Sequence, residues 1–195
     1  DYLAAEFRSH GRSLKWLHRL LMNSATYQMS SDFRPEARDI DPLNRLWHRM
    51  PVRRLEGEAI RDTLLALSGG LKPELYGESI MPHLTPFMVG RGRPGASGPL
   101  DGNGRRSIYL SVRRNFLSPM FLAFDYPLPM TTAGRRSVSN VPAQALTLMN
   151  SEFAVQQTRY WAEKGKAAEW TDEERIRSLY REAFAREPTD VELQT

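Results

Sequence analysis

The sequence lacks cysteine, and it lacks any hydrophobic run long enough to cross a membrane. Without cysteine, these 195 residues can form no disulfide, no thiolate metal site, no covalent haem attachment through C-x-x-C-H and no cysteine nucleophile. A membrane-spanning helix needs about 20 consecutive apolar residues, and no stretch approaches that length. We therefore predict that this segment carries neither a membrane span nor a haem.

Lysine is also scarce. It occurs only at positions 15, 72, 164 and 166, so arginine supplies 23 of the 27 cationic side chains. A guanidinium is a planar fork that matches carboxylates, phosphates and sulfates, and it tolerates burial better than an ammonium group does. A GC-rich genome would favour arginine codons as well, so composition alone assigns no role. The 23 acidic residues are interspersed among the cations, which argues against nucleic-acid binding.

Apolar residues recur mostly at helical spacing, which predicts a mainly α fold. Ser13 can cap the helix that follows it, Pro142 suits the first turn of a helix, and Gly69 is a typical helix stop. Thr171 and Glu174 have the spacing of a capping box. The helices that we expect cover residues 2–9, 13–30, 41–50, 52–68, 142–165 and 172–184, with a short one within 116–127.

A small β element is expected within this helical pattern. Residues 107–112 alternate between polar and apolar side chains, as a half-buried strand does. The best local partner is the segment 138–141, because the letters GRRS accompany both segments, at 104–107 and 134–137. We predict a short two-stranded element formed by these two segments.

The length of 195 residues suits one domain with its own core. We expect a single helical domain over residues 1–188, which contains a long Gly- and Pro-rich loop over residues 86–104. Thr189 and Glu192 repeat the capping-box spacing, which predicts that a further helix begins there. We therefore expect residues 189–195 to be a truncated helix and the chain to be a fragment of a larger multidomain protein.

Three arginine pairs in one part of the chain are the candidate ligand-binding residues. If the two predicted strands pair, several of these guanidinium groups converge, and one face could accept sulfate, carboxylate or phosphate groups. Residues 113 and 114 point to opposite faces of a strand, so not all the candidates can serve one site. Structural salt bridges are the alternative role. The candidates are Arg105, Arg106, Arg113, Arg114, Arg135 and Arg136.

The catalytic candidates are weaker, and no metal site is predicted. The sequence has no G-x-S-x-G elbow, no phosphate-binding glycine loop and no H-E-x-x-H pair, and its four histidines lack metal-ligand spacing. Glu58 and Asp62 lie four residues apart on one helix face and could act as acid and base. The arginines around them favour a structural ion network instead. Asp125, within FDYP, and Tyr27 are further candidates for acid–base work.

Six segments of the chain match one family in order. They are SLKWLHRLLMNSATYQMSS, DPLNRLWHRMPVRRLEGEAIRDTLLALSGGL, RRSIYLSVRRN, FDYP, GRRSVSNVPAQALTLMNSEFAVQQ and RIRSLYREAFAREPTDVEL. Together they closely resemble the planctomycete-specific C-terminal domain of unknown function, the PSD1 or DUF1553 family. The resemblance covers roughly residues 2–193, and the loop over residues 86–104 matches least.

The resemblance implies an exported, extracytoplasmic parent protein in which a c-type haem lies in another domain. It implies sister domains of the same polypeptide as partners, in a setting of complex, often sulfated, polysaccharide breakdown. It brings no assigned activity and no catalytic residues. We therefore expect an accessory module that packs on a sister domain and binds an anionic polysaccharide. A sugar-acting acid–base enzyme with an arginine-lined cleft is the first alternative, and nucleic-acid binding is the least favoured.

Overall fold

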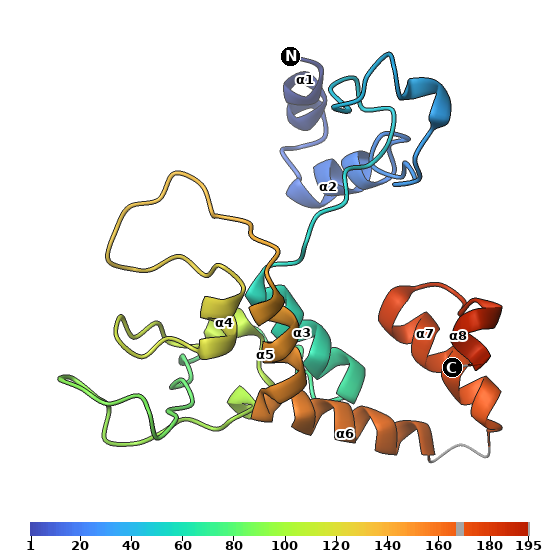
Figure 1. The fold of residues 1–195 in the computed structure, drawn as a ribbon. Coiled ribbons are helices and arrows are strands. Elements are labelled where there is room, and N and C mark those ends of the chain that lie inside the picture. Colours follow the sequence, from blue (N-terminus) through green and yellow to red (C-terminus); the bar gives the residue numbers. More distant parts are fainter. Residues whose placement is uncertain (167–169, 195) are drawn as a thin grey trace. The chain divides into compact units, whose positions relative to one another are not determined.

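The computed structural model describes residues 1–166 and 170–194, and it confirms a mainly helical fold (Figure 1). The chain divides into two compact units, Asp1–Arg54 and Leu55–Thr195, which we call the N-terminal and C-terminal units. The α-helices are α1 (Tyr2–Ser9), α2 (Leu14–Met22), α3 (Gly57–Ser68), α4 (Pro119–Ala123), α5 (Pro142–Asn150), α6 (Glu152–Lys166), α7 (Asp172–Phe184) and α8 (Asp190–Gln194). Three short 3-10 helices are η1 (Pro35–Ala37), η2 (Gly102–Gly104) and η3 (Ser107–Tyr109).

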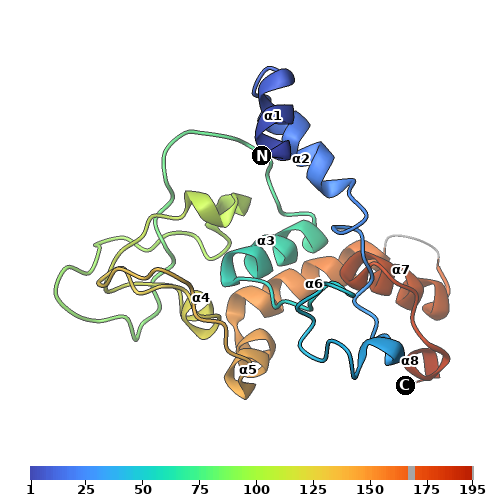
Figure 2. The same cartoon turned by 90° about the horizontal axis from the view of Figure 1, so that it is seen from above.

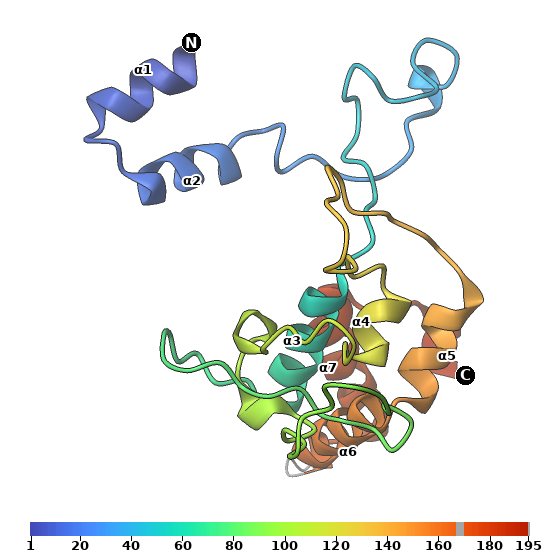
Figure 3. The ribbon, with the colours of Figure 1, turned by 90° about the vertical axis from the view of Figure 1, so that its left-hand side faces the viewer.

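The N-terminal unit contains two short helices joined by a sharp turn (Figure 3). Gly11 takes a positive φ of 66° in this turn, and the Ser13 hydroxyl accepts the amide N–H of Trp16 at 3.2 Å to cap α2. Helix α2 ends at Met22 and not at residue 30 as predicted, because residues 23–28 form turns. Asp41 is the one buried residue of this unit, all of whose residues are described.

Residues 41–50 do not form the predicted helix. The Asp41 carboxylate instead accepts the backbone N–H groups of Arg45 at 2.8 Å and Leu46 at 2.7 Å. These two bonds, together with the nearby His48 side chain, lower the pKa of Asp41 against the opposing effect of burial. A carboxylate that satisfies backbone donors in this way stabilises a turn and not a helix.

The C-terminal unit is built around α3, which packs mainly against α6 and also contacts α4 and η3 (Figure 2). The buried core comprises Leu65, Met120, Phe124 and Phe153. Gly57 begins α3 where a Cβ atom would lie 3.2 Å from the Cβ of Phe124, so the absent side chain allows close approach to α4. At the other end, Gly69 stops the helix with a φ of 79°, as predicted.

The predicted two-stranded element is not confirmed. Residues 107–109 form the 3-10 helix η3, and the described residues contain only two isolated β-bridges, Lys72–Arg105 and Ile80–Leu110. The segment 138–141 has no strand, and the backbone N–H of Ser139 donates to the Asp125 carboxylate at 2.7 Å. The alternation of polar and apolar residues does not mark a strand here. Polar groups of both segments hydrogen-bond to side chains elsewhere in the chain, Asp62 and Asp125, and not to each other.

The Gly- and Pro-rich loop over residues 86–104 has irregular structure with defined attachments. Its Ser97 hydroxyl accepts the Leu84 backbone N–H at 2.8 Å, and the Gly98 backbone N–H donates to the Pro82 carbonyl at 3.0 Å. A Cβ atom at Gly98 would overlap the carbonyl of Met81. The loop is therefore anchored at this point by a backbone approach that only glycine permits.

The C-terminal helices confirm both capping boxes. At α7, Thr171 and Glu174 exchange side-chain and backbone hydrogen bonds. At α8, the backbone N–H of Thr189 donates to Glu192 at 2.8 Å, and the Glu192 N–H donates back to the Thr189 hydroxyl at 3.4 Å. Two hydrogen bonds from the Arg186 guanidinium are the main cause that lowers the pKa of Glu192 to about 2. A helix thus begins where we predicted, while the domain boundary at residue 188 stays a prediction.

The predicted continuous helix over 142–165 is divided in two. Ser151 adopts an extended conformation with a φ of −65° and a ψ of 124°, which separates α5 from α6.

In residues 1–166 and 170–194, no helix combines the length and the apolar character that crossing a bilayer requires.

Candidate functional site

The polar centre of the C-terminal unit is the buried guanidinium of Arg61, which is 4% exposed. It projects from α3 and donates to the backbone carbonyls of Asp101 at 2.5 Å and Arg105 at 3.0 Å. It also donates to the Ser107 hydroxyl at 3.1 Å and lies over the Phe153 ring. Burial lowers the pKa of Arg61 from its usual value, with Asp62 and Asp101 opposing this effect.

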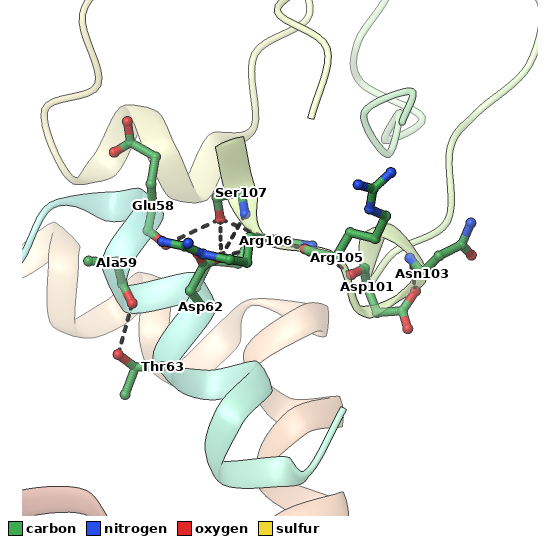
Figure 4. A network of polar contacts seen from close by, with 10 residues as sticks. Glu58, Ala59, Asp62, Thr63, Asp101, Asn103, Arg105, Arg106 and Ser107 are labelled. Atoms are coloured by element: carbon green, nitrogen blue, oxygen red, sulfur yellow. Dashed lines mark hydrogen bonds and ion pairs between the residues drawn. The ribbon is translucent and has the colours of Figure 1, made fainter. Parts of the chain in front are cut away.

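Asp62, a predicted catalytic candidate, is bound within this polar centre (Figure 4). Its carboxylate accepts both the backbone N–H and the hydroxyl of Ser107, each at 2.7 Å. Its other oxygen lies 3.5 Å from Nε of Arg106. Asp62 therefore ties η3 to α3 through Ser107, a partner that the sequence spacing did not reveal.

Two glycines make this arrangement possible. Gly102 has a φ of 61°, and a Cβ atom there would lie 2.5 Å from Nη2 of Arg61. Gly104 has a φ of 72°, and a Cβ atom there would overlap the carbonyl of Gly70. The η2 backbone can therefore approach α3 closely enough for its carbonyl groups to accept the Arg61 donors.

Arg105 is structural. Its guanidinium donates to the carbonyls of Glu78, at 3.1 Å, and of Tyr76. It also lies 3.9 Å from the centroid of the Tyr109 ring, which is a close cation–π contact. These contacts join the segment after Lys72 to the segment that leads into η3. The Arg105 guanidinium is therefore used to hold these two segments together.

Two of the six arginine candidates, Arg106 and Arg136, line one cleft, which we call the Arg136 cleft. Its volume is about 490 Å³. The floor is apolar and includes Phe116, Leu117 and Phe121, while the rim is charged. The full lining is Glu56, Glu58, Ala59, Asp62, Pro82, Arg106, Ser107, Ile108, Leu110, Ser111, Val112, Phe116, Leu117, Ser118, Phe121, Tyr126 and Arg136.

Arg136 is held at the rim by two carboxylates. It lies 2.8 Å from Glu58 and 3.0 Å from Glu56, and its guanidinium is 5.6 Å from the centroid of the Tyr126 ring. Its hydrogen bond to Glu58 is the main cause that raises the pKa of Arg136. The lining contains three carboxylates and two guanidinium groups, so an anionic ligand would have to compete with Glu56 and Glu58 for Arg136.

The remaining arginine candidates do not join the Arg136 cleft. Arg113 is exposed and donates to the sulfur of Met81 at 3.5 Å. Arg114 and Arg135 are exposed and do not line the cleft. The strand pairing on which the predicted convergence of several guanidinium groups depended does not form, and two of the six candidates, Arg106 and Arg136, line this cleft.

The other catalytic candidates, Asp125 and Tyr27, are also separate from the cleft lining. The Asp125 carboxylate accepts the backbone N–H and the hydroxyl of Ser139, at 2.7 and 2.9 Å. The buried amide of Gln144 donates to the same hydroxyl at 3.1 Å. Tyr27 lies in the N-terminal unit with 54% of its surface exposed. Asp125 is therefore part of a hydrogen-bonded loop, and Tyr27 is a surface residue of the N-terminal unit.

Sequence reasoning missed Ser107 and Tyr126 as residues of the cleft. Ser107 stands directly after an arginine pair, and Tyr126 follows Asp125 in FDYP, so both are sequence neighbours of predicted site residues. Within the described ranges, no group of three or more His, Asp or Glu side chains is placed to hold a metal ion.

The C-terminal unit is therefore a helical module whose charged motif residues bind its own backbone and which carries a cleft lined by both polar and apolar residues. The chain belongs to the protein family of unknown function PSD1 (DUF1553), whose family model matches residues 1–195. No curated protein and no solved structure matches the chain.

Proposed function

We propose that this chain is a non-catalytic accessory module of an exported, cytochrome-linked protein, and that its N-terminal unit packs on a sister domain. The observation that carries the proposal is the lack of a buried apolar core in residues 1–54, where no apolar side chain is fully buried. The exported location and the haem-bearing sister domain come from the family resemblance. The apolar surface supports the packing role.

Helix α2 presents the clearest apolar surface in this unit. Leu14 is 63% exposed, Leu21 is 39% exposed and Met22 is 53% exposed. Burying one such side chain fully contributes about 1.5–3 kcal/mol. A unit of this size must bury apolar surface to offset the conformational entropy lost on folding. A surface contributed by another domain would supply that burial.

The test is hydrogen exchange in the parent protein and in the isolated chain of residues 1–195. We expect amide groups of α2 to exchange at least about tenfold more slowly in the parent, which corresponds to about 1.4 kcal/mol of added protection. Amide groups of α3, which carries the buried core residue Leu65, provide the internal control and should exchange alike in both samples. Equal protection of α2 in the two samples would contradict docking on a sister domain.

A second candidate function is binding of an anionic polysaccharide in the Arg136 cleft. It is favoured because Arg136 lies over the Tyr126 ring, and because Arg106 and Phe121 line the same cleft. Binding is favoured over acid–base catalysis because protein donors already occupy both oxygens of Asp62. Glu56, whose side chain is 63% exposed, can turn away and free part of the Arg136 guanidinium for a sulfate or carboxylate, while Glu58 keeps its own contacts with Arg136.

A thermal-shift titration tests the polysaccharide proposal with sulfated, uronate and neutral oligosaccharides. We expect a sulfated or uronate ligand to raise the melting temperature, because a ligand at 100 times its Kd adds about 2.7 kcal/mol to the free energy of unfolding. Arg136→Ala should abolish the shift. Arg135→Ala is the matched control, since Arg135 is the adjacent exposed residue outside the cleft. If both variants respond like the native chain, the cleft does not bind these ligands.

A further inference from the structure

The net positive charge of the chain lies in its N-terminal unit. Residues 1–54 hold ten Lys or Arg and six Asp or Glu, a net charge of +4. Residues 55–195 hold 17 cationic and 17 acidic residues, so they add no net charge. The whole excess of +4 therefore belongs to the smaller unit. An excess of this kind attracts anionic partners, and salt weakens the attraction.

Four arginines of this unit have no acidic partner. In the N-terminal unit, all of whose residues are described, the ion pairs are formed by other side chains. The guanidinium groups of Arg38 and Arg49 instead lie 6.0 and 5.3 Å from the centroid of the half-exposed Phe33 ring. An anion would displace no carboxylate to reach these cations. The four are Arg34, Arg38, Arg45 and Arg49.

Large apolar side chains are exposed in the same segment. Each is between 46% and 80% exposed, and they are Ile40, Leu43, Leu46 and Trp47. Ile40 and Leu46 line one hollow of about 290 Å³. Its wall also contains charged side chains, and the full lining is Arg34, Glu36, Ala37, Ile40, Asp41, Leu46 and His48. Apolar groups and a guanidinium group therefore share one face of this unit.

The backbone of this segment is already hydrogen-bonded at several of its polar groups. The Asp41 carboxylate accepts the N–H groups of Arg45 and Leu46. The Asn44 side chain donates to the Arg49 carbonyl at 2.8 Å and accepts the Arg49 N–H at 3.3 Å. An unpaired backbone group is costly in a lipid environment. These groups can therefore enter a membrane interface without losing their partners.

From these features we infer that residues 33–49 bind the surface of an anionic phospholipid membrane; we call them the 33–49 surface. The exposed leucine, isoleucine and tryptophan side chains enter the interfacial layer, where tryptophan is favoured, and the arginines contact lipid phosphates and carboxylates. Charge selects the lipid as the occupant, because an apolar protein pocket would not account for four guanidinium groups without acidic partners. This inference depends neither on docking of α2 nor on polysaccharide binding in the Arg136 cleft.

Sedimentation of the chain of residues 1–195 with vesicles tests the inference. The vesicles contain phosphatidylcholine with about 30% phosphatidylserine, or phosphatidylcholine alone. We expect binding to the anionic vesicles, a partition coefficient at least about tenfold lower for the neutral ones, and weaker binding as salt is added. No binding to the anionic vesicles would overturn the inference. Slow hydrogen exchange of residues 40–49 in the parent protein, without vesicle binding, would assign the surface to a protein partner and overturn it equally.

Leu46→Ser separates insertion from adsorption by charge. It should lower the partition coefficient for the anionic vesicles at least about tenfold, because an apolar side chain no longer enters the interface. Leu128→Ser is the matched control, since Leu128 is an exposed leucine of the C-terminal unit. Leu14→Ser, on α2, should also leave vesicle binding unchanged. An unchanged partition coefficient for Leu46→Ser, or an equal loss in either control, would refute the 33–49 surface.

Arg38→Gln tests the electrostatic part. Loss of one cation near an anionic membrane should lower the partition coefficient about fivefold. Arg135→Gln removes the same charge from an exposed position of the C-terminal unit and should have little effect. Equal losses in the two arginine variants would show that net charge alone drives binding, and would overturn the assignment to residues 33–49. Far-UV circular dichroism verifies that each variant is folded.

Discussion

Replacing Arg61 by methionine is expected to lower the free energy of unfolding by about 3–5 kcal/mol. The side chain is 4% exposed and donates to two backbone carbonyls of the segment around η2. Methionine would fill most of the volume, but it would leave those carbonyls and part of the Asp62 contact network without donors in a buried place. Urea denaturation followed by far-UV circular dichroism measures the change.

Arg106→Met is the matched control for this prediction. Arg106 has 53% of its side chain exposed and contacts the same aspartate, Asp62, at 3.5 Å. Surface ion pairs of this kind contribute about 0–1 kcal/mol, so the control should unfold nearly like the native chain. If the two variants lost similar stability, Arg61 would not be the polar centre of the C-terminal unit.

Gly98→Ala is expected to lower the free energy of unfolding by about 1–3 kcal/mol and to loosen the loop over residues 86–104. The added Cβ atom would overlap the carbonyl of Met81, and a backbone atom cannot move aside as a flexible side chain can. The hydrogen bond from the Gly98 N–H to the Pro82 carbonyl would be lost as the segments around Pro82 and Gly98 move apart. Thermal denaturation and limited proteolysis within the loop measure the two effects.

Gly95→Ala provides the comparison within the same loop. A Cβ atom at Gly95 meets no atom within 4 Å, and its φ lies outside the left-handed region. This substitution should leave stability unchanged or raise it by a few tenths of a kcal/mol, because alanine restricts the unfolded chain. Equal destabilisation by both substitutions would show that Gly98 is not a special point of contact.

Local signals in the sequence were sufficient for most helix ends. Thr171 and Glu174 cap α7 as their spacing predicts, and Gly69 ends α3 in the left-handed conformation. Each of these interactions closes within a few residues, so composition and spacing specify it without any tertiary context. The same reason explains why family membership could be read from ordered motifs before the fold was known.

The β element and the convergence of arginines could not be predicted in this way. Ser107 gives its N–H and hydroxyl to Asp62, which lies 45 residues earlier in the chain. No local pattern distinguishes a serine that binds a helix from a serine that belongs to a strand. Alternation over residues 107–112 therefore predicted a strand where a 3-10 helix forms.

The sequence by itself determined the helical class, the caps and the abundance of guanidinium groups. Only the tertiary structure decided what each guanidinium binds. Arg105 and Arg106 are adjacent and chemically identical, yet Arg105 is committed to the carbonyls of Tyr76 and Glu78 while Arg106 lines the Arg136 cleft. The physical reason is that a side chain's partners depend on which distant segments surround it, and that is settled only when the core has packed.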